Sequence, residues 1–352
     1  MQSRPTTRRK VEVEKLGHGG AGGGGDGRAG RTPCIIVTGE IPTYLCMVGH
    51  WKSPNYQSTQ DGRRICTMRA MRDIEMDNPH RRVVLLLDMD CFYAQCESIR
   101  LGLDQKIPLA LIQWRSALAV NYPAREFGIK RGDSFEDIRE KSQGRCVCIH
   151  LPVTLVDQTN HSSVAEPVSP QKDVGAFDPA SLVDSYNAEF NQPKEVRERM
   201  YKSEKNKMRH QSEGKANLNR YRLASARIFR LIDDTLRRIL GRGGYILERA
   251  SIDELFIDVT PFCYGNGADL KVGEGPDRAS PTKEKERAEI AAFRSAFERD
   301  PYKAMEETNV CHSQDVDTNE KEVGRALRLG CHISLAVRQA VFQELSFTLS
   351  GV

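Results

Sequence analysis

The sequence contains no long apolar run. No segment approaches the roughly 18 apolar residues that a membrane-spanning helix requires, and the start of the chain lacks the basic-then-apolar order of a secretion signal. The ten cysteines include no CxxC pair, and the closest spacings, Cys91 with Cys96 and Cys146 with Cys148, match neither a zinc site nor a secreted disulfide framework. We therefore expect a soluble intracellular protein with reduced thiols.

A large excess of one charge is also missing, because the net charge is only +4 over 352 residues. Residues 1–32 carry all of it, with seven Lys or Arg against three acids, so any basic groove elsewhere must arise from segregated charge. Nine glycines fall between Gly17 and Gly30. We predict that residues 1–80 form a disordered, low-complexity extension, for which a flexible tail is favoured over a nucleic-acid-contacting arm.

Regular structure is predicted to begin at Val83–Leu87, a β-prone apolar run that fits a strand buried on both faces. Helical spacing follows over Cys91–Leu101, with Gly102 as a stop. Three further strands are then expected, the first two as a hairpin-like pair: Leu109–Ile112, Ala117–Val120 and Cys146–Leu151.

Two polar insertions are predicted, a long surface segment at 154–213 with one helix near 194–206, and a partly helical segment at 265–319. Apolar residues spaced three and four apart predict helices over Arg220–Leu240 and Lys321–Leu345. The remaining predicted strands are Tyr245–Leu247, Leu255–Val259 and one beginning at Phe347.

Acidic residues occur at two positions suited to chemistry: Asp88 at the end of the first strand, and Asp253 with Glu254 between two β-prone runs. A carboxylate at a buried strand end is costly unless it is paired or binds a metal, and adjacent acids repel. Mg²⁺ prefers such oxygen ligands, and two ions can hold the attacking and leaving oxygens of a phosphoryl displacement. The acids indicate a two-metal site, although Asp88 or Asp253 as a mere cap of a helix or turn stays open.

Residues suited to a nucleoside triphosphate stand between these acids. Tyr122, Arg125 and Arg131 are expected on a helix after a strand, where arginine can bind phosphate oxygens bidentately. Taken alone, the two arginines are equally compatible with solvated surface charges. Phe92 and Tyr93 follow the first strand, so one ring could wall a sugar pocket while the other packs in the core, unless both are core residues.

The sequence resembles the Y-family of translesion DNA polymerases, which carry the UmuC domain, in four segments that occur in the family's order. Leu87–Glu97 is similar to the first acidic motif and Tyr122–Arg131 to the finger motif. Gly214–Asn217, with Tyr221 and Arg222, is similar to the next block, and Ala250–Glu254 to the second acidic motif. Gln113 with Trp114, and the long insertion, resemble the fungal eta-type subfamily more than kappa-like or iota-like members.

The resemblance implies a role for each matching residue. Asp88, Asp253 and Glu254 would be the catalytic ligands of two Mg²⁺ ions, with the Met89 carbonyl as a further ligand. Tyr93 would exclude a ribose 2′-hydroxyl, and Gln113 would contact the template base. The expected nucleotide-binding residues are Cys91, Phe92, Tyr93, Tyr122, Arg125 and Arg131.

The resemblance also implies an α/β (α+β) fold: a palm with an antiparallel, ferredoxin-like sheet at 81–90 and 220–350, and a small fingers region at 91–219. It ends near residue 350, so we expect the thumb, the little finger, and the ubiquitin-binding and sliding-clamp elements to be missing from this chain, as in a truncated product or an incomplete gene model. We expect such a chain to extend primers poorly, because phosphate contacts supply much DNA affinity.

The implied function is template-directed addition of deoxynucleotides to primer–template DNA opposite damaged bases, as part of DNA repair. The implied location is the nucleus, and no membrane partner is expected. Two alternatives stay open. One is an impaired fragment that binds DNA or a partner protein. The other is a palm-type nucleotidyl cyclase, against which the Tyr122–Arg131 and Gly214–Asn217 segments argue.

Overall fold

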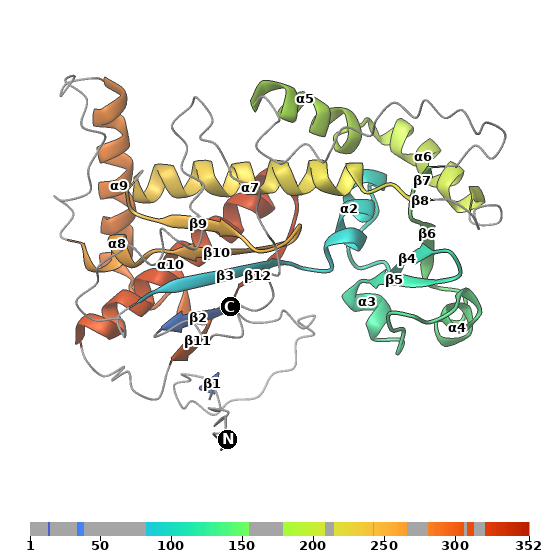
Figure 1. The fold of residues 1–352 in the computed structure, drawn as a ribbon, viewed down its shortest axis with the longest axis horizontal. Helices are drawn as coiled ribbons and strands as arrows, with labels where there is room; N and C mark the ends of the chain where they lie inside the picture. Colours follow the sequence, from blue (N-terminus) through green and yellow to red (C-terminus); the bar gives the residue numbers. More distant parts are fainter. Residues whose placement is uncertain are drawn as a thin grey trace, which may run out of the picture.

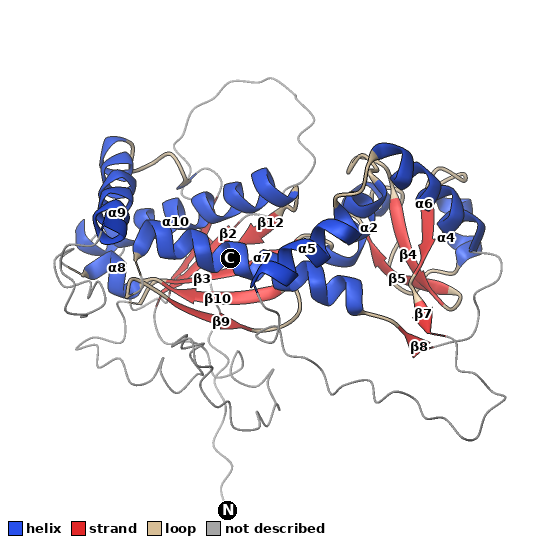
Figure 2. Ribbon diagram, turned by 90° about the horizontal axis from the view of Figure 1, so that it is seen from above, coloured by secondary structure: helices blue, strands red, loops and turns tan. Residues whose placement is uncertain are grey.

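The computed structural model describes residues 13–14, 34–38, 82–154, 179–207, 215–241, 243–265, 281–305, 308–312 and 321–351. Within these residues the chain forms a seven-stranded sheet at one end of the molecule and a three-stranded sheet at the other, with a two-stranded ribbon beside the latter (Figure 1). Helices pack along both larger sheets (Figure 2). In this part of the chain no helix is both long and apolar enough to cross a membrane.

The large sheet has the strand order β1-β11-β2-β3-β10-β9, and β12 also pairs with β3. One side of β3 is occupied by β10, while β2 and β12 share its other side. The strands are β1 (Val13–Glu14), β2 (Cys34–Thr38), β3 (Val84–Met89), β9 (Ile246–Arg249), β10 (Glu254–Asp258), β11 (Thr308–His312) and β12 (Leu349–Gly351).

The four strands expected in this sheet are present, and all their pairings are antiparallel. The sheet as a whole is mixed, because β11 runs parallel to β2. In addition, β1 and β2 come from the segment 1–80, which was expected to be a disordered extension. The other residues up to 81 lie outside the described residues. The antiparallel expectation therefore holds around β3 and fails at the β2–β11 edge.

The two faces of the large sheet differ in burial. Leu85, Leu87 and Met89 of β3 are at most 1% exposed and join the main hydrophobic core, as do the alternate residues of β10. Leu86 and Asp88 point to the other face and are only half-buried. The expectation that this strand is buried on both faces is therefore wrong over its second half, and the acids stand on its more open face.

Two long helices contribute most of the main core, and both match the sequence periodicity. α7 (Asn219–Leu240) and α10 (Lys321–Leu345) pack against each other over the sheet (Figure 2). The short helix α8 (Thr260–Tyr264) packs beside α10. α2 (Phe92–Leu101) follows β3 and ends at Gly102, whose φ of 65° suits glycine in the left-handed region.

The predicted insertions contain more packed structure than expected. α6 (Lys194–Lys207) forms where a helix was predicted, but α5 (Pro179–Phe190) precedes it and packs on α7. Tyr186 and Phe190 of α5 are each 1% exposed and stack at 4.7 Å between ring centroids, so this part is not a surface segment. In the second insertion, α9 (Pro281–Arg299) buries Phe297. Residues 155–178, 208–214, 266–280, 306–307 and 313–320 lie outside the described residues.

The small sheet has the order β5-β4-β6, with an antiparallel β4–β5 hairpin and a parallel β4–β6 pair. A separate cluster of seven buried residues, from Ala110 to Ile138, forms its own core. The nearby elements are β4 (Leu109–Gln113), β5 (Ser116–Val120), α3 (Tyr122–Arg125), α4 (Phe135–Lys141), β6 (Val147–His150), β7 (Val153–Thr154) and β8 (Lys215–Ala216). α2 and α5 belong to the main core instead, so the predicted boundary at residue 91 does not coincide with a packing boundary.

Candidate active site

The acids from the two predicted motifs lie on adjacent strands. Glu254 pairs directly with Asp88 in the antiparallel register of β10 and β3. Asp253 precedes this pair in a bend, where the Met89 amide donates to the Asp253 carbonyl oxygen at 2.9 Å. The Ser251 hydroxyl donates to Asp253 Oδ1 at 2.6 Å and so orients that carboxylate. The β3–β10 register therefore brings all three acids to one end of the ladder.

Negative charge accumulates around Asp88. Burial raises the pKa of its carboxyl, and the neighbouring Asp253, Glu254 and Asp90 carboxylates raise it further, to about 7. Crowded oxygen donors with uncompensated charge suit a hard divalent cation such as Mg²⁺. Among the described residues, however, no three His, Cys, Asp or Glu side chains converge closely enough to hold a metal ion. The donor chemistry fits Mg²⁺, and the side chains would have to draw together to ligate it.

The raised pKa predicts a pH dependence. In Mg²⁺-free buffer, Asp88 should titrate at about pH 7, observable as a carboxyl ¹³C resonance that Asp88→Asn removes. Because the folded-state pKa is raised, Asp88 stabilises the fold when protonated, and this contribution is lost as pH rises from its ordinary 3.8 through about 7. Mg²⁺ needs the ionised form, so its affinity should increase about tenfold between about pH 6 and pH 8. A resonance that titrates near pH 4, with pH-independent Mg²⁺ affinity, would contradict this.

The two aromatic residues after β3 have different environments. Cys91 adopts a left-handed conformation, with φ 46°, at the turn from β3 into α2. Phe92 is 2% exposed and belongs to the main core, whereas Tyr93 is only half-buried. Burial raises the pKa of the Tyr93 hydroxyl, with Asp253 the next largest cause, so Tyr93 lies near the acids. One ring is thus in the core and the other borders the acidic cluster.

Tyr122 and Arg125 lie on α3, near the end of β3. The Tyr122 hydroxyl is 3.4 Å from Asp90 Oδ1, and the Arg125 guanidinium lies 5.0 Å from the Tyr122 ring centroid. Asn121 holds this helix in place: its side-chain oxygen accepts from the Leu109 amide at 2.9 Å and caps α3, while its amide nitrogen donates to the Ile107 carbonyl at 2.8 Å. Asn121, which was not among the predicted site residues, therefore positions Tyr122 and Arg125, which were.

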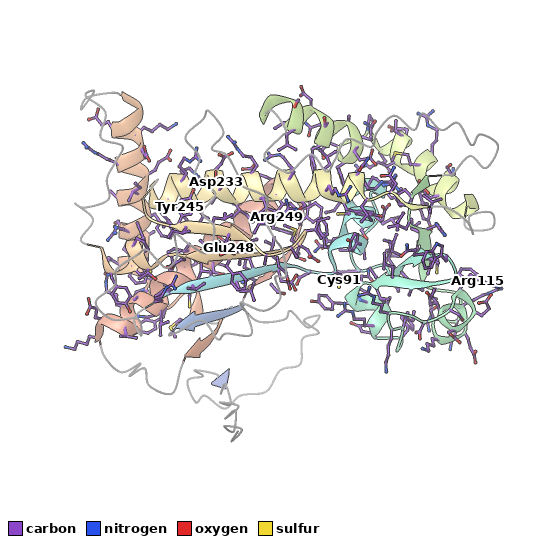
Figure 3. The ribbon with its side chains drawn as sticks, in the orientation of Figure 1. Cys91, Arg115, Asp233, Tyr245, Glu248 and Arg249 are labelled. Atoms are coloured by element: carbon purple, nitrogen blue, oxygen red, sulfur yellow. The ribbon has the colours of Figure 1, made fainter. Side chains whose placement is uncertain are left out.

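Arg131 and Gln113 are placed differently from these residues. Arg131 is exposed and lies in a turn after α3 instead of on a helix, although its charge acts on Tyr93. Gln113 is half-buried at the turn of the β4–β5 hairpin, the end opposite the one that leads into Tyr122. Figure 3 shows Arg115, in that turn, far from Cys91. Gln113 is therefore not among the residues gathered at the acids.

Two residues near the acids were not selected from the sequence. Asp90 accepts a hydrogen bond from the Ser350 hydroxyl and a long one, of 3.4 Å, from the Tyr122 hydroxyl. Ser350 lies on β12 and pairs with Asp88. The sequence Asp88-Met89-Asp90 could have indicated Asp90, because it follows the predicted catalytic aspartate by two residues. No comparable sequence feature near residue 350 indicated that Ser350 would lie at the site. Of the Gly214–Asn217 block, Gly214 lies outside the described residues, and Lys215 and Ala216 pair with β7.

Comparison with known proteins gives a consistent result. The family model described as "impB/mucB/samB family" matches residues 87–351. The chain is 39% identical to DNA polymerase eta of Saccharomyces cerevisiae over 67 residues, and 24% identical to DNA polymerase eta of Arabidopsis thaliana over 277 residues. It is 46% identical to N-acetyltransferase eso1 of Schizosaccharomyces pombe over 69 residues.

The extent of these alignments differs. The Arabidopsis alignment covers 77% of this chain and 30% of that polymerase. The Saccharomyces alignment covers 19% of this chain and 10% of that protein, and the Schizosaccharomyces alignment covers 20% and 8%. The aligned part of the chain thus spans less than a third of the length of each of these relatives.

Proposed function

The chain belongs to the impB/mucB/samB family, that is, to the Y-family DNA polymerases, and on this basis we propose that it provides the catalytic palm and fingers of an eta-like translesion polymerase. The proposed reaction is template-directed addition of a deoxynucleotide to a primer, including opposite damaged bases. The primer 3′-hydroxyl attacks the α-phosphate of the nucleotide and pyrophosphate leaves. Its proposed substrates are primer–template DNA and deoxynucleoside triphosphates, and its proposed location is the nucleus.

The observation that carries this proposal is the pairing of Asp88 with Glu254 beside Asp253 on the open face of the sheet. These carboxylates, with the Met89 carbonyl, would hold two Mg²⁺ ions. Bound there, Mg²⁺ would neutralise the triphosphate and lower the pKa of the attacking hydroxyl. The protein's part is then mainly electrostatic and positional, because the β3–β10 ladder holds the backbone of the acids at one end of the sheet, from which their side chains would draw together around the ions.

The neighbouring side chains suit the rest of the nucleotide. Tyr122 and Arg125, next to Asp90, would hold the triphosphate, and Arg131 would reach the incoming base. Tyr93, beside the acids, would occupy the space of a 2′-hydroxyl, while Cys91 and Phe92 would shape the pocket around it. Gln113 is proposed to contact the template base, which requires the template to reach the hairpin turn.

The test is single-nucleotide incorporation on a primer–template under single-turnover conditions, with protein in excess so that weak DNA binding does not hide chemistry. We expect Mg²⁺-dependent extension by the nucleotide that the template specifies, with pyrophosphate as the second product. DNA binding without extension would favour an impaired fragment. Consumption of nucleotide without a primer, giving a cyclic product, would favour a cyclase. Either result would overturn the proposal.

A further inference from the structure

A buried cluster of charged and hydroxyl groups lies beside the second half of α2. The Glu97 side chain is fully buried, and its Oε2 accepts from Arg100 Nε at 2.9 Å and Nη2 at 2.6 Å. Its Oε1 accepts from Arg220 Nη1 at 3.0 Å and from the Tyr221 hydroxyl at 2.8 Å. One carboxylate therefore binds three side chains from two helices.

This cluster also reaches the helices of the first insertion. Arg220 Nε lies 3.2 Å from Glu189 on α5, and Arg100 lies 3.5 Å from Glu204 on α6. Burying such charges has a desolvation cost, and apolar side chains of similar size often stabilise a core at least as well. The cluster is therefore weak evidence for a role in stability, and fixing one particular geometry is the alternative role that its network of contacts suggests.

The Tyr221 ring links the cluster to the acidic site. It packs against the Tyr93 ring in an edge-to-face arrangement, with ring centroids 4.8 Å apart and an interplanar angle of 73°. Tyr93 and Glu97 are four residues apart on α2, so they share one face of that helix. Tyr221 itself is 0% exposed and spans this face, with its hydroxyl on Glu97 and its ring against Tyr93.

We propose that Tyr221, held by Glu97, is a positioning residue that fixes the Tyr93 ring and thereby sets discrimination between deoxyribonucleotides and ribonucleotides. This inference rests on the proposed function, in which Tyr93 excludes the 2′-hydroxyl. A half-buried ring such as Tyr93 excludes an extra oxygen only if it cannot turn away. The fully buried Tyr221 ring packs against it at 4.8 Å between centroids, and Phe92 packs at the longer distance of 5.6 Å.

The test compares Tyr221→Phe with Tyr245→Phe. Both variants remove a tyrosine hydroxyl from a carboxylate, since Tyr245 donates to Asp233 Oδ1 at 2.6 Å. Tyr245 and Asp233 lie toward the opposite end of the sheet from Cys91, so this control leaves the α2 region intact (Figure 3). Tyr221→Phe keeps the ring and leaves Glu97 paired with both arginines, so the fold should survive.

Two readouts are needed. In the first, the ratio of kcat/KM for a deoxynucleotide to that for the matching ribonucleotide should fall by about fivefold or more in Tyr221→Phe, since small displacements at a reacting centre have large effects. The ratio should not change in Tyr245→Phe. The second readout is ¹⁹F NMR of the 3-fluorotyrosine-labelled protein, in which the Tyr93 resonance is assigned as the one that Tyr93→Phe removes. This resonance should shift or broaden in Tyr221→Phe and not in Tyr245→Phe.

The two readouts separate the inference from the function on which it rests. Wild-type selectivity that Tyr221→Phe leaves unchanged would overturn the inference while the polymerase assignment stands. An unchanged Tyr93 resonance would overturn it independently of any activity. If the wild-type chain adds no nucleotide, the proposed function fails and the selectivity role fails with it, even where the resonance shifts.

Discussion

Asp253→Asn is expected to lower the rate of Mg²⁺-dependent nucleotide addition by about a thousandfold or more, roughly 4 kcal/mol of transition-state stabilisation. The same holds for Asp88→Asn. Each change removes one negative oxygen from the acidic site while keeping the size of the side chain. Because the carboxylates are crowded, the asparagine variants should fold at least as well as the wild-type chain, since removing one charge relieves repulsion. The loss should therefore appear in kcat and not in the amount of folded protein.

The same sheet face provides a matched control. Glu248 on β9 pairs with Phe256, which lies two residues along β10 from Glu254 and therefore on the same face. It is also a half-buried carboxyl whose pKa burial raises, yet it is not among the charges that act on Asp88. Glu248→Gln should leave the rate within about twofold of wild type, as expected for a change away from the reacting centre. Equal losses in Glu248→Gln and Asp253→Asn, or near-normal activity in Asp253→Asn, would contradict the assignment of the acids.

Periodicity predicted the elements whose pattern is uninterrupted. The bounds of α10, Lys321–Leu345, agree with the predicted range because apolar residues recur at helical spacing along its whole length. α5 was missed because Leu182, Tyr186 and Phe190 are few, and they lie in a segment of mostly polar composition. Their burial depends on α7, which begins at Asn219, about thirty residues after α5 ends at Phe190. The local sequence pattern does not indicate a packing partner so far away in the chain.

The candidate site shows the same division. The acids could be predicted because a carboxylate at the end of a buried strand has a desolvation cost unless it is paired or binds a metal. The sequences around them also resemble known motifs. That Glu254 rather than Asp253 would stand opposite Asp88 could not be predicted, because a shift of one residue in register reverses the faces. Ser350 acts through a hydrogen bond to a carboxyl group distant in sequence, which leaves no local signal. Asn121 did offer a local signal, as an N-cap followed two residues later by a proline, but its bonds to Leu109 and Ile107 could not be predicted from it. Gln113 was assigned a role by resemblance, and its place at the hairpin turn leaves that role a prediction.

The buried cluster around Glu97 leads to the largest expected effect on stability. Glu97→Gln should reduce the free energy of unfolding at pH 7 by about 3–5 kcal/mol, because the buried Arg100 and the part-buried Arg220 lose the buried carboxylate that they share. Each arginine then keeps only a more exposed acid, Glu204 for Arg100 and Glu189 for Arg220. Arg100 is only 1% exposed, so water cannot replace the lost carboxylate. Urea unfolding of the full chain measures this loss. Asp234→Asn is the control: it breaks the exposed Arg230–Asp234 pair, 2.9 Å apart on α7, and should cost no more than about 0.5 kcal/mol.

The pH dependence of that loss distinguishes a charge effect from a packing effect. Burial alone would raise the pKa of Glu97, but Arg100 and Arg220 outweigh it and hold the pKa below its usual 4.5. A lowered folded-state pKa contributes stability above the unfolded-state value, and this contribution is lost as pH falls through the folded-state value. The difference between wild type and Glu97→Gln should therefore be constant above about pH 5 and shrink below the usual pKa of 4.5. A difference that persists unchanged at low pH would mean that the carboxylate's shape, and not its charge, holds Arg100, Arg220 and Tyr221 in place.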